Sequence, residues 1–293
     1  MKVQSICLDE IEILKRFANM EQHFPRHNGR RFFPSVNFYL NFNDDPINTI
    51  KKEAENMLLF VGMGMYNAIV KTESLNGAAG FIKLTDDMNA EITLEKNICK
   101  NADIVLSTLA HEICHKILYK NNIYFGKILE IEDEIYADLA TFYVGFGYFT
   151  MKGYLIENEQ ILNCSSQKFG YLTPDTYARA YQLMNAINGV VKDSDYKDFP
   201  EHVRREIDFA TPQCSLSSIR ELNCDSVSQI FKQTLSDAAD IKLLLDLIKS
   251  AIEGNSLKLR ERFNEINKCF YDFGDKKDFE WHKISIAYAT FKL

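Results

Sequence analysis

The stretch HEICH at residues 111–115 constrains the fold of this chain more than any other feature. It places two of the chain's six histidines four residues apart. An α-helix brings residues at that spacing onto one face, one turn apart. We therefore predict a helix over residues 100–122, capped by Asn101 or Asp103 and ended at Asn121–Asn122. The apolar residues of this helix, which lie largely on the side opposite the histidines, are Leu106, Leu109, Ala110, Ile113 and Ile117.

The residue types in HEICH point to a metal site. Neutral imidazoles are good zinc ligands, so His111 and His115 are candidate ligands, while Glu112 lies about 100° around the helix. An HExxH match arises by accident in on the order of one chain in a hundred, so a chance motif is the first alternative. A catalytic zinc site usually has three protein ligands and a water, so a third ligand is needed.

A second predicted helix, over residues 130–146, supplies candidate acids for that role. Glu134 and Asp138 are four residues apart in EIYAD and share one helix face. A solvated acidic first turn explains the acids before Glu134. It does not explain Asp138, which lies deeper in an apolar helix, where a carboxylate is costly unless it is paired or bound to a metal.

HEICH followed by EIYAD resembles the gluzincin metallopeptidases, whose pattern is HExxH, a spacer and ExxxD. The EIYADLA form is especially similar to the M48-type peptidases and their small soluble bacterial relatives, and the resemblance covers residues 90–150. It implies that His111, His115 and Glu134 bind Zn²⁺. It also implies Glu112 as the general base and Asp138 as the carboxylate that orients a ligand imidazole, His111 in particular.

The fold class that the resemblance implies is α+β. We expect a zincin-like core, with a small mixed sheet, the active-site helix and the third-ligand helix, followed by a mostly helical C-terminal region. In such a fold the strand before the HExxH helix lies at the sheet edge and pairs with the bound peptide. The stretch AEITLEKN, residues 90–97, occupies that place and is expected to bind substrate by strand addition.

The resemblance also implies a donor that stabilises the oxyanion formed during hydrolysis, for which related peptidases use a downstream His, Tyr or Arg. The sequence does not choose among the candidates, and each also fits a structural role. These candidates are Tyr136, Tyr143, Tyr177, Tyr181, His202, Arg204 and Arg205.

The remaining organisation follows from periodicity and capping signals. Further strands are predicted over residues 35–42, 60–70 and 80–87. Further helices are predicted over residues 8–21, 44–58, 171–189, 225–254 and 256–274. The polar connector at 191–202 suggests a boundary between a zincin-like domain, 1–190, and a helical C-terminal domain, 191–293.

Composition excludes several classes of function. The net charge is −7 without a dense basic run, which argues against nucleic acid as the partner. The longest apolar stretch, residues 57–70, is shorter than the roughly 20 residues of a spanning helix, so no membrane insertion is expected. Acids at positions 9, 10 and 12 interrupt a secretory signal. Seven cysteines without a CxxC pair fit reduced thiols, so we expect a cytoplasmic protein.

Three functions are compatible with these observations. The first is a zinc metallopeptidase that acts on a peptide or protein substrate. The second is a non-catalytic zincin-fold binding or regulatory protein, with the C-terminal helices as its interaction surface. The third is a metal-dependent hydrolase of non-peptide amides. Glu112 separates the first from the second, because a purely structural metal site does not need a general base.

Overall fold

The computed structural model describes residues 5–26, 30–75, 77–126, 130–156, 167–168, 170–188 and 196–210. The chain divides into two compact units. The first consists of Met1–Cys7 and Gln22–Tyr177, and the second of Leu8–Glu21 and Ala178–Leu293. The helices predicted over 225–254 and 256–274 lie outside the described residues. Within the described residues, no helix has the length and apolar character needed to cross a membrane.

The first unit contains a three-stranded sheet of β1 (Asn67–Glu73), β2 (Gly80–Ile82) and β3 (Asn89–Glu95). The strand order is β1-β3-β2, with β1 parallel and β2 antiparallel to β3. On β3, buried residues alternate with half-buried ones, which is the pattern of a sheet with one face against a core. The chain is therefore of mixed α and β structure, as predicted.

The prediction that residues 90–97 form the edge strand was wrong. They contain most of β3, which has β1 on one side and β2 on the other. The physical reason is that sequence order does not fix pairing order. The short strand β2 folds back onto β3 and becomes the antiparallel edge strand in its place.

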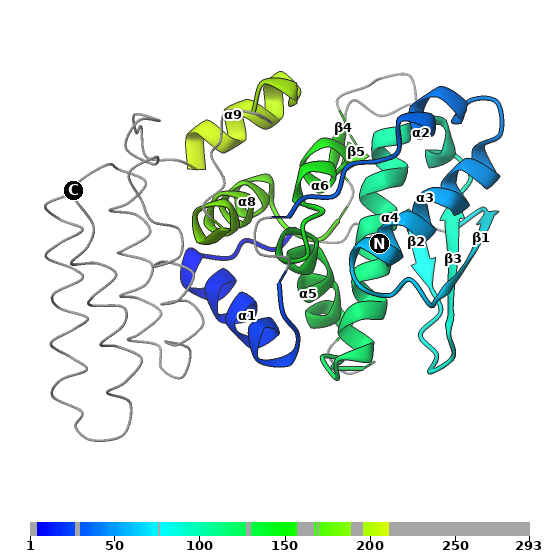
Figure 1. Ribbon diagram of the computed structural model, residues 1–293. Helices are drawn as coiled ribbons and strands as arrows, with labels where there is room; N and C mark the ends of the chain where they lie inside the picture. The colour runs from blue at the N-terminus through cyan, green and yellow to red at the C-terminus, as the bar shows by residue number, and fades with distance from the viewer. Residues whose placement is uncertain are drawn as a thin grey trace, which may run out of the picture. The chain divides into compact units, whose positions relative to one another are not determined.

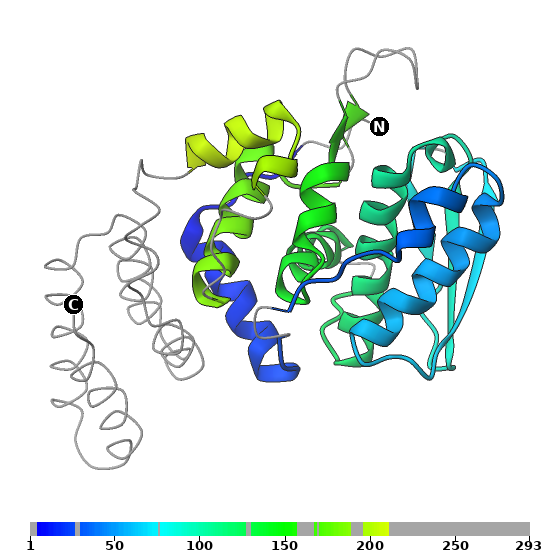
Figure 2. The same ribbon diagram turned by 45° about the horizontal axis from the view of Figure 1, so that its top comes forward.

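Two helices cover the buried face of the sheet, α3 (Pro46–Phe60) and α4 (Ala102–Lys120), as Figures 1 and 2 show. The Asp45 side chain caps α3 and Pro46 is its first residue. The Asn101 side chain caps α4 by accepting hydrogen bonds from the two backbone amides of Asp103 and Ile104. Beyond its end, Asn122 adopts a φ of 59°. These start and stop signals agree with the predicted ones.

Helices α5 (Glu130–Tyr143) and α6 (Gly147–Gly153) pack on α4, on the side away from the sheet (Figure 1). A short 3₁₀ helix, η1 (Ile98–Lys100), connects β3 to α4. The strands β4 (Leu155–Ile156) and β5 (Gln167–Lys168) form an antiparallel pair after α6. Helix α4 thus lies between the sheet and the helices α5 and α6, and this position fixes the orientation of its side chains.

Residues 35–42 were predicted to form a strand, and this was wrong, because they contain the helix α2 (Val36–Asn41). The alternation of apolar residues also fits a helix, since Phe38 and Phe42 are four residues apart. Both are buried, with ring centroids 5.3 Å apart, whereas Val36 and Leu40 are 83% and 69% exposed. The structure uses the four-residue spacing and leaves the other two side chains in solvent.

The second unit contains most of α1 (Glu10–His23), most of α8 (Pro174–Asn188), the short η3 (Tyr196–Asp198) and α9 (Glu201–Ala210). Arg179 pairs with Glu10 at 3.4 Å and joins α8 to α1. The Gln182 side chain donates to the carbonyl oxygen of Ile207 at 2.6 Å and joins α8 to α9. The described part of this unit is helical.

Candidate metal centre

Helix α4 presents both histidines of HEICH on one face. The ring centroids of His111 and His115 are 4.7 Å apart, and both side chains are partly buried, with 16% and 12% of their surface exposed. All five apolar residues predicted to anchor this helix are buried. Burial of one side of the helix therefore directs the two imidazoles toward α5, on its other side.

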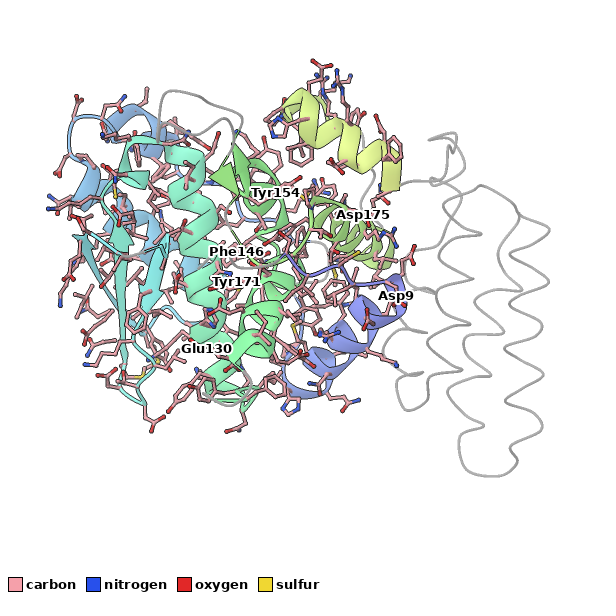
Figure 3. All side chains as sticks on the ribbon, turned by 180° about the vertical axis from the view of Figure 1, so that it is seen from behind. Asp9, Glu130, Phe146, Tyr154, Tyr171 and Asp175 are labelled. Atoms are coloured by element: carbon pink, nitrogen blue, oxygen red, sulfur yellow. The ribbon has the colours of Figure 1, made fainter. Side chains whose placement is uncertain are left out.

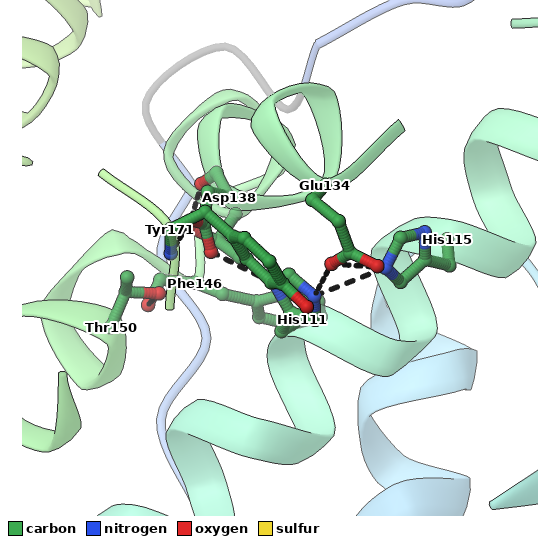
Figure 4. A network of polar contacts seen from close by, with 8 residues as sticks. His111, His115, Glu134, Asp138, Phe146, Thr150 and Tyr171 are labelled. Atoms are coloured by element: carbon green, nitrogen blue, oxygen red, sulfur yellow. Dashed lines mark hydrogen bonds and ion pairs between the residues drawn. The ribbon is translucent and has the colours of Figure 1, made fainter. Parts of the chain in front are cut away.

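Helix α5 brings Glu134 to the two imidazoles (Figure 4). Glu134 Oε2 lies 3.0 Å from His111 Nε2 and 3.3 Å from His115 Nε2, and the two Nε2 atoms are 3.0 Å apart. The three side chains thus direct one ligand atom each toward a common point. The sequence-predicted ligands are brought together within the first unit.

The spacing of these atoms suits zinc. Ligands of a tetrahedral zinc ion lie about 2.0–2.1 Å from the metal, and hence about 3.3 Å from one another. The observed separations of 3.0–3.3 Å are close to that value. Two ring nitrogens and a carboxylate oxygen that face one another also require a proton or a cation between them. The donor set therefore fits a zinc ion.

Asp138, one turn after Glu134 on α5, contacts the outer nitrogen of His111. Its Oδ1 lies 2.8 Å from His111 Nδ1, and its Oδ2 accepts a hydrogen bond of 2.8 Å from the backbone amide of Tyr171. The hydroxyl group of Tyr177 also donates to this carboxylate. Three donors thus satisfy a carboxylate of which 4% is exposed, and they fix the orientation of the His111 ring.

Glu112 lies on the other side of His111, against the edge strand β2. The backbone amide of Ile82 donates to its carboxylate. A Cβ atom on Gly80 would lie 2.7 Å from Glu112 Oε1 and 2.6 Å from Thr108 Cγ2, so a larger residue here would have to displace the Glu112 carboxylate or the Thr108 methyl group. Strand β3 makes backbone hydrogen bonds with Ala79 and Lys83. In an antiparallel pair such bonds alternate along the strand, so the N–H and C=O groups of Gly80 and Ile82 point away from β3, toward the free edge.

The charges of the cluster shift the pKa values of its members. Burial opposes protonation of His111, but the carboxylates of Asp138 and Glu134 raise its pKa well above the usual value. Burial by itself raises the pKa of Glu134, but hydrogen bonds from both histidines hold it well below its usual range. Burial raises the pKa of Glu112. Without a metal, the cluster therefore retains a proton that a cation would displace.

The candidate oxyanion donors within the first unit turn their hydroxyl groups elsewhere or are buried. Tyr143 donates to the carbonyl oxygen of Phe24 at 2.9 Å, and Tyr177 donates to Asp138. Tyr136 is buried with its ring against Phe125. The remaining candidates, Tyr181, His202, Arg204 and Arg205, belong to the second unit.

Sequence reasoning missed Tyr171, which lies beside α4 and α5 (Figure 3). Its ring is nearly parallel to that of His111, at an angle of 18° and with centroids 6.3 Å apart. Figure 4 shows its hydroxyl group directed toward the ligand atoms of the cluster. Burial and the nearby carboxylates of Glu134, Asp138 and Glu112 raise its pKa, so it stays protonated at neutral pH. The only sequence signal was its place just before the cap of α8.

No known family, curated protein or solved structure matches this chain. The resemblance of HEICH and EIYAD to the gluzincins therefore stays a prediction. What supports a function for this site is the geometry of its own residues.

Proposed function

We propose that this protein is a zinc-dependent metallopeptidase of the gluzincin type. The observation that carries the proposal is the convergence of His111 Nε2, His115 Nε2 and Glu134 Oε2, which lie 3.0–3.3 Å from one another. Glu112 directly follows His111 on the same helix, α4. The three residues would hold the zinc ion. Zinc in such a site lowers the pKa of a water to about 7 and polarises a carbonyl group.

The number of ligands supports a catalytic rather than a structural site. Structural zinc ions in proteins usually have four protein ligands, whereas catalytic ones have three and leave one position for water or substrate. Among the described residues, the cluster consists of three side chains. Glu112 is buried close to these three side chains but is not one of them, so its carboxylate is left to act as a general base.

Glu112 would move the protons of the reaction. Its carboxylate accepts a proton as the water oxygen attacks the carbonyl carbon of the scissile peptide bond. It then delivers that proton to the amide nitrogen, the C–N bond breaks, and the products are a carboxylic acid and an amine. Asp138 keeps His111 in the orientation and tautomer that leave Nε2 free to bind the metal.

The edge strand β2 is the proposed position of the substrate. The outward-facing amide of Ile82 donates to Glu112, so an extended peptide that adds to this edge would pair with the backbone groups of Gly80 and the carbonyl oxygen of Ile82 and run past the general base. This assigns to β2 the role that the sequence suggested for residues 90–97.

Replacement of Glu112 by Gln tests the proposal. Zinc content per chain is measured first, and then hydrolysis of a library of quenched fluorescent peptides. We expect one zinc in both proteins and a loss of kcat of about 10²–10⁴-fold in Glu112→Gln. Glu55→Gln, on the exposed face of α3, is the matched control and should retain full activity. Zinc-loaded wild-type protein that cleaves no peptide, or a Glu112→Gln variant as active as the wild type, would contradict the proposal.

A further inference from the structure

Tyr171 is held over the cluster through its backbone as well as its ring. Its amide donates to Asp138 Oδ2 at 2.8 Å, and its carbonyl oxygen accepts a hydrogen bond of 2.8 Å from the amide of Ile6. The amide of Thr173 donates in turn to the carbonyl oxygen of Ile6, also at 2.8 Å, which forms a parallel bridge between Ile6 and Leu172. Both backbone groups of Tyr171 are thus fixed, one by α5 and one by the N-terminal segment.

The chain just before Tyr171 allows this close contact with Asp138. Gly170 has a φ of 95°, in the region that favours glycine. A Cβ atom at this position would collide with the hydroxyl oxygen of Tyr177 and lie 3.2 Å from Asp138 Oδ1. The backbone therefore reaches the carboxylate only because residue 170 is glycine.

The direction of the hydroxyl group gives this arrangement a chemical use. The ring runs alongside His111, and the hydroxyl group ends near the side of the cluster where Glu134 and the Nε2 atom of His111 lie (Figure 4). A tyrosine hydroxyl is protonated at neutral pH and donates one hydrogen bond. The negative charge that develops on a carbonyl oxygen beside the cluster needs such a donor, fixed in advance.

We propose that Tyr171 is a catalytic residue that donates a hydrogen bond to the oxygen of the scissile carbonyl group, and that the pairing of Ile6 with its segment sets its position. This inference rests on the proposed peptidase function. Tyr171 contacts the reacting atoms, whereas Ile6 is a positioning residue that acts through its backbone. The N-terminal segment would then control turnover without contacting the substrate.

The first test compares wild-type protein with Tyr171→Phe, which keeps the ring and removes only the hydroxyl group. Zinc content, kcat, KM and the affinity for a capped phosphinic Phe–Ala pseudodipeptide are measured, because its tetrahedral phosphinate imitates the charged intermediate. We expect unchanged zinc content, a similar KM, a fall in kcat of about 10²–10³-fold and a loss of phosphinate affinity of roughly tenfold or more. Tyr124→Phe, a half-exposed tyrosine, is the control and should match the wild type.

The second test concerns Ile6. Proline at this position removes the amide that donates to Tyr171, whereas Cys7→Pro, one residue later, leaves both hydrogen bonds of Ile6 in place. Ile6→Pro should weaken phosphinate binding in the wild-type background and leave it unchanged in the Tyr171→Phe background, since both changes act through one hydroxyl group. Cys7→Pro should have no effect in either background.

The outcomes separate this inference from the function on which it rests. A wild-type protein that cleaves peptides, together with a zinc-loaded Tyr171→Phe variant that keeps kcat and phosphinate affinity within twofold, overturns the role of Tyr171 and leaves the peptidase function intact. Equal effects of Ile6→Pro in both backgrounds overturn the positioning role of Ile6. A zinc-loaded wild-type protein that neither cleaves peptides nor binds the phosphinate overturns both the function and the inference.

Discussion

Replacement of Asp138 by Asn is the change from which the structure predicts the most. The side chain keeps its size, but it loses the charge that three donors share: His111 Nδ1, the amide of Tyr171 and the hydroxyl group of Tyr177. An asparagine side chain accepts through one atom only, and its NH₂ group is itself a donor. Because His111 Nδ1 and the amide of Tyr171 contact different oxygens of Asp138, the NH₂ group must then face one of these two partners.

The magnitude follows from this count of hydrogen bonds. Hydrogen bonds to charged groups contribute about 1.5–3 kcal/mol and neutral ones about 0.5–1.5 kcal/mol, and a buried unsatisfied group costs about 1–3 kcal/mol. One charged hydrogen bond lost and one buried donor left unsatisfied together cost about 2.5–6 kcal/mol, so Asp138→Asn should lower the free energy of unfolding of the metal-free protein by about that amount. Loss of the contact that orients His111 should also weaken zinc affinity by about 10–100-fold, or about 1.4–2.8 kcal/mol.

The assay measures both quantities, and α5 supplies a matched control. Zinc affinity is measured by competition with a chelator at neutral pH, and stability by denaturant unfolding of metal-free protein. Asp133 is also buried on α5 and accepts hydrogen bonds from the amides of Phe125 and Gly126, at 2.7 and 3.1 Å, but it forms no hydrogen bond or ion pair with His111 or His115. Asp133→Asn should lower stability and change zinc affinity by less than about threefold.

The comparison decides what Asp138 does. If Asp138→Asn lowers stability but binds zinc as tightly as Asp133→Asn does, the carboxylate supports the fold and does not orient a metal ligand. The reasoning about His111 would then be refuted, although the three hydrogen bonds to Asp138 would stand.

Two further predictions concern Gly80 and pH. Gly80→Ala places a methyl group 2.7 Å from Glu112 Oε1 and 2.6 Å from Thr108 Cγ2. It should lower kcat by about 10–100-fold with zinc retained, and Thr108→Ser should restore part of that loss. An unchanged kcat would contradict this prediction. Burial lowers the pKa of His111, but the carboxylates of Asp138 and Glu134 outweigh it and raise that pKa. In metal-free protein, the stability contributed by protonated His111 is full below about pH 6.5 and is lost as pH rises through the raised pKa. Zinc should therefore increase Tm more at about pH 8 than at about pH 6. An equal increase at the two pH values would contradict this.

The helices were predictable because their signals are local. The cap at Asn101, the proline at 46 and the Asn121–Asn122 end each act within one turn, and the structure places helix boundaries at or next to them. The strands were less predictable. The order β1-β3-β2 depends on which side of β3 the short segment at 80–82 returns to, and no residue pattern within a strand specifies this. The error at α2 has another cause, because its apolar residues fit both the two-residue period of a strand and the four-residue spacing of a helix.

Asp138 and Tyr171 show why one site residue was predictable and the other was not. A carboxylate within an apolar helix requires compensation, so its sequence context alone indicates partners. Tyr171 is placed by a hydrogen bond from its amide to Asp138, by its ring stacked on His111 and by the backbone pairing of its segment with Ile6. Backbone amides are the same in every residue type, and a tyrosine is common in any core.

The buried charge of Asp138 connects these two residues physically. One of its oxygens holds the imidazole of His111, and the other holds the amide of Tyr171, whose hydroxyl group is directed at the same cluster. A single carboxylate therefore sets the position of a proposed ligand and of a proposed donor. Because the two positions depend on one group, substitutions at Asp138 and Tyr171 should not be additive in kcat, whereas substitutions at Asp138 and Gly80, which contacts Glu112 instead, should be closer to additive. Comparison of the two double variants measures that coupling directly, and additive effects of Asp138→Asn and Tyr171→Phe would show that the carboxylate positions only the histidine.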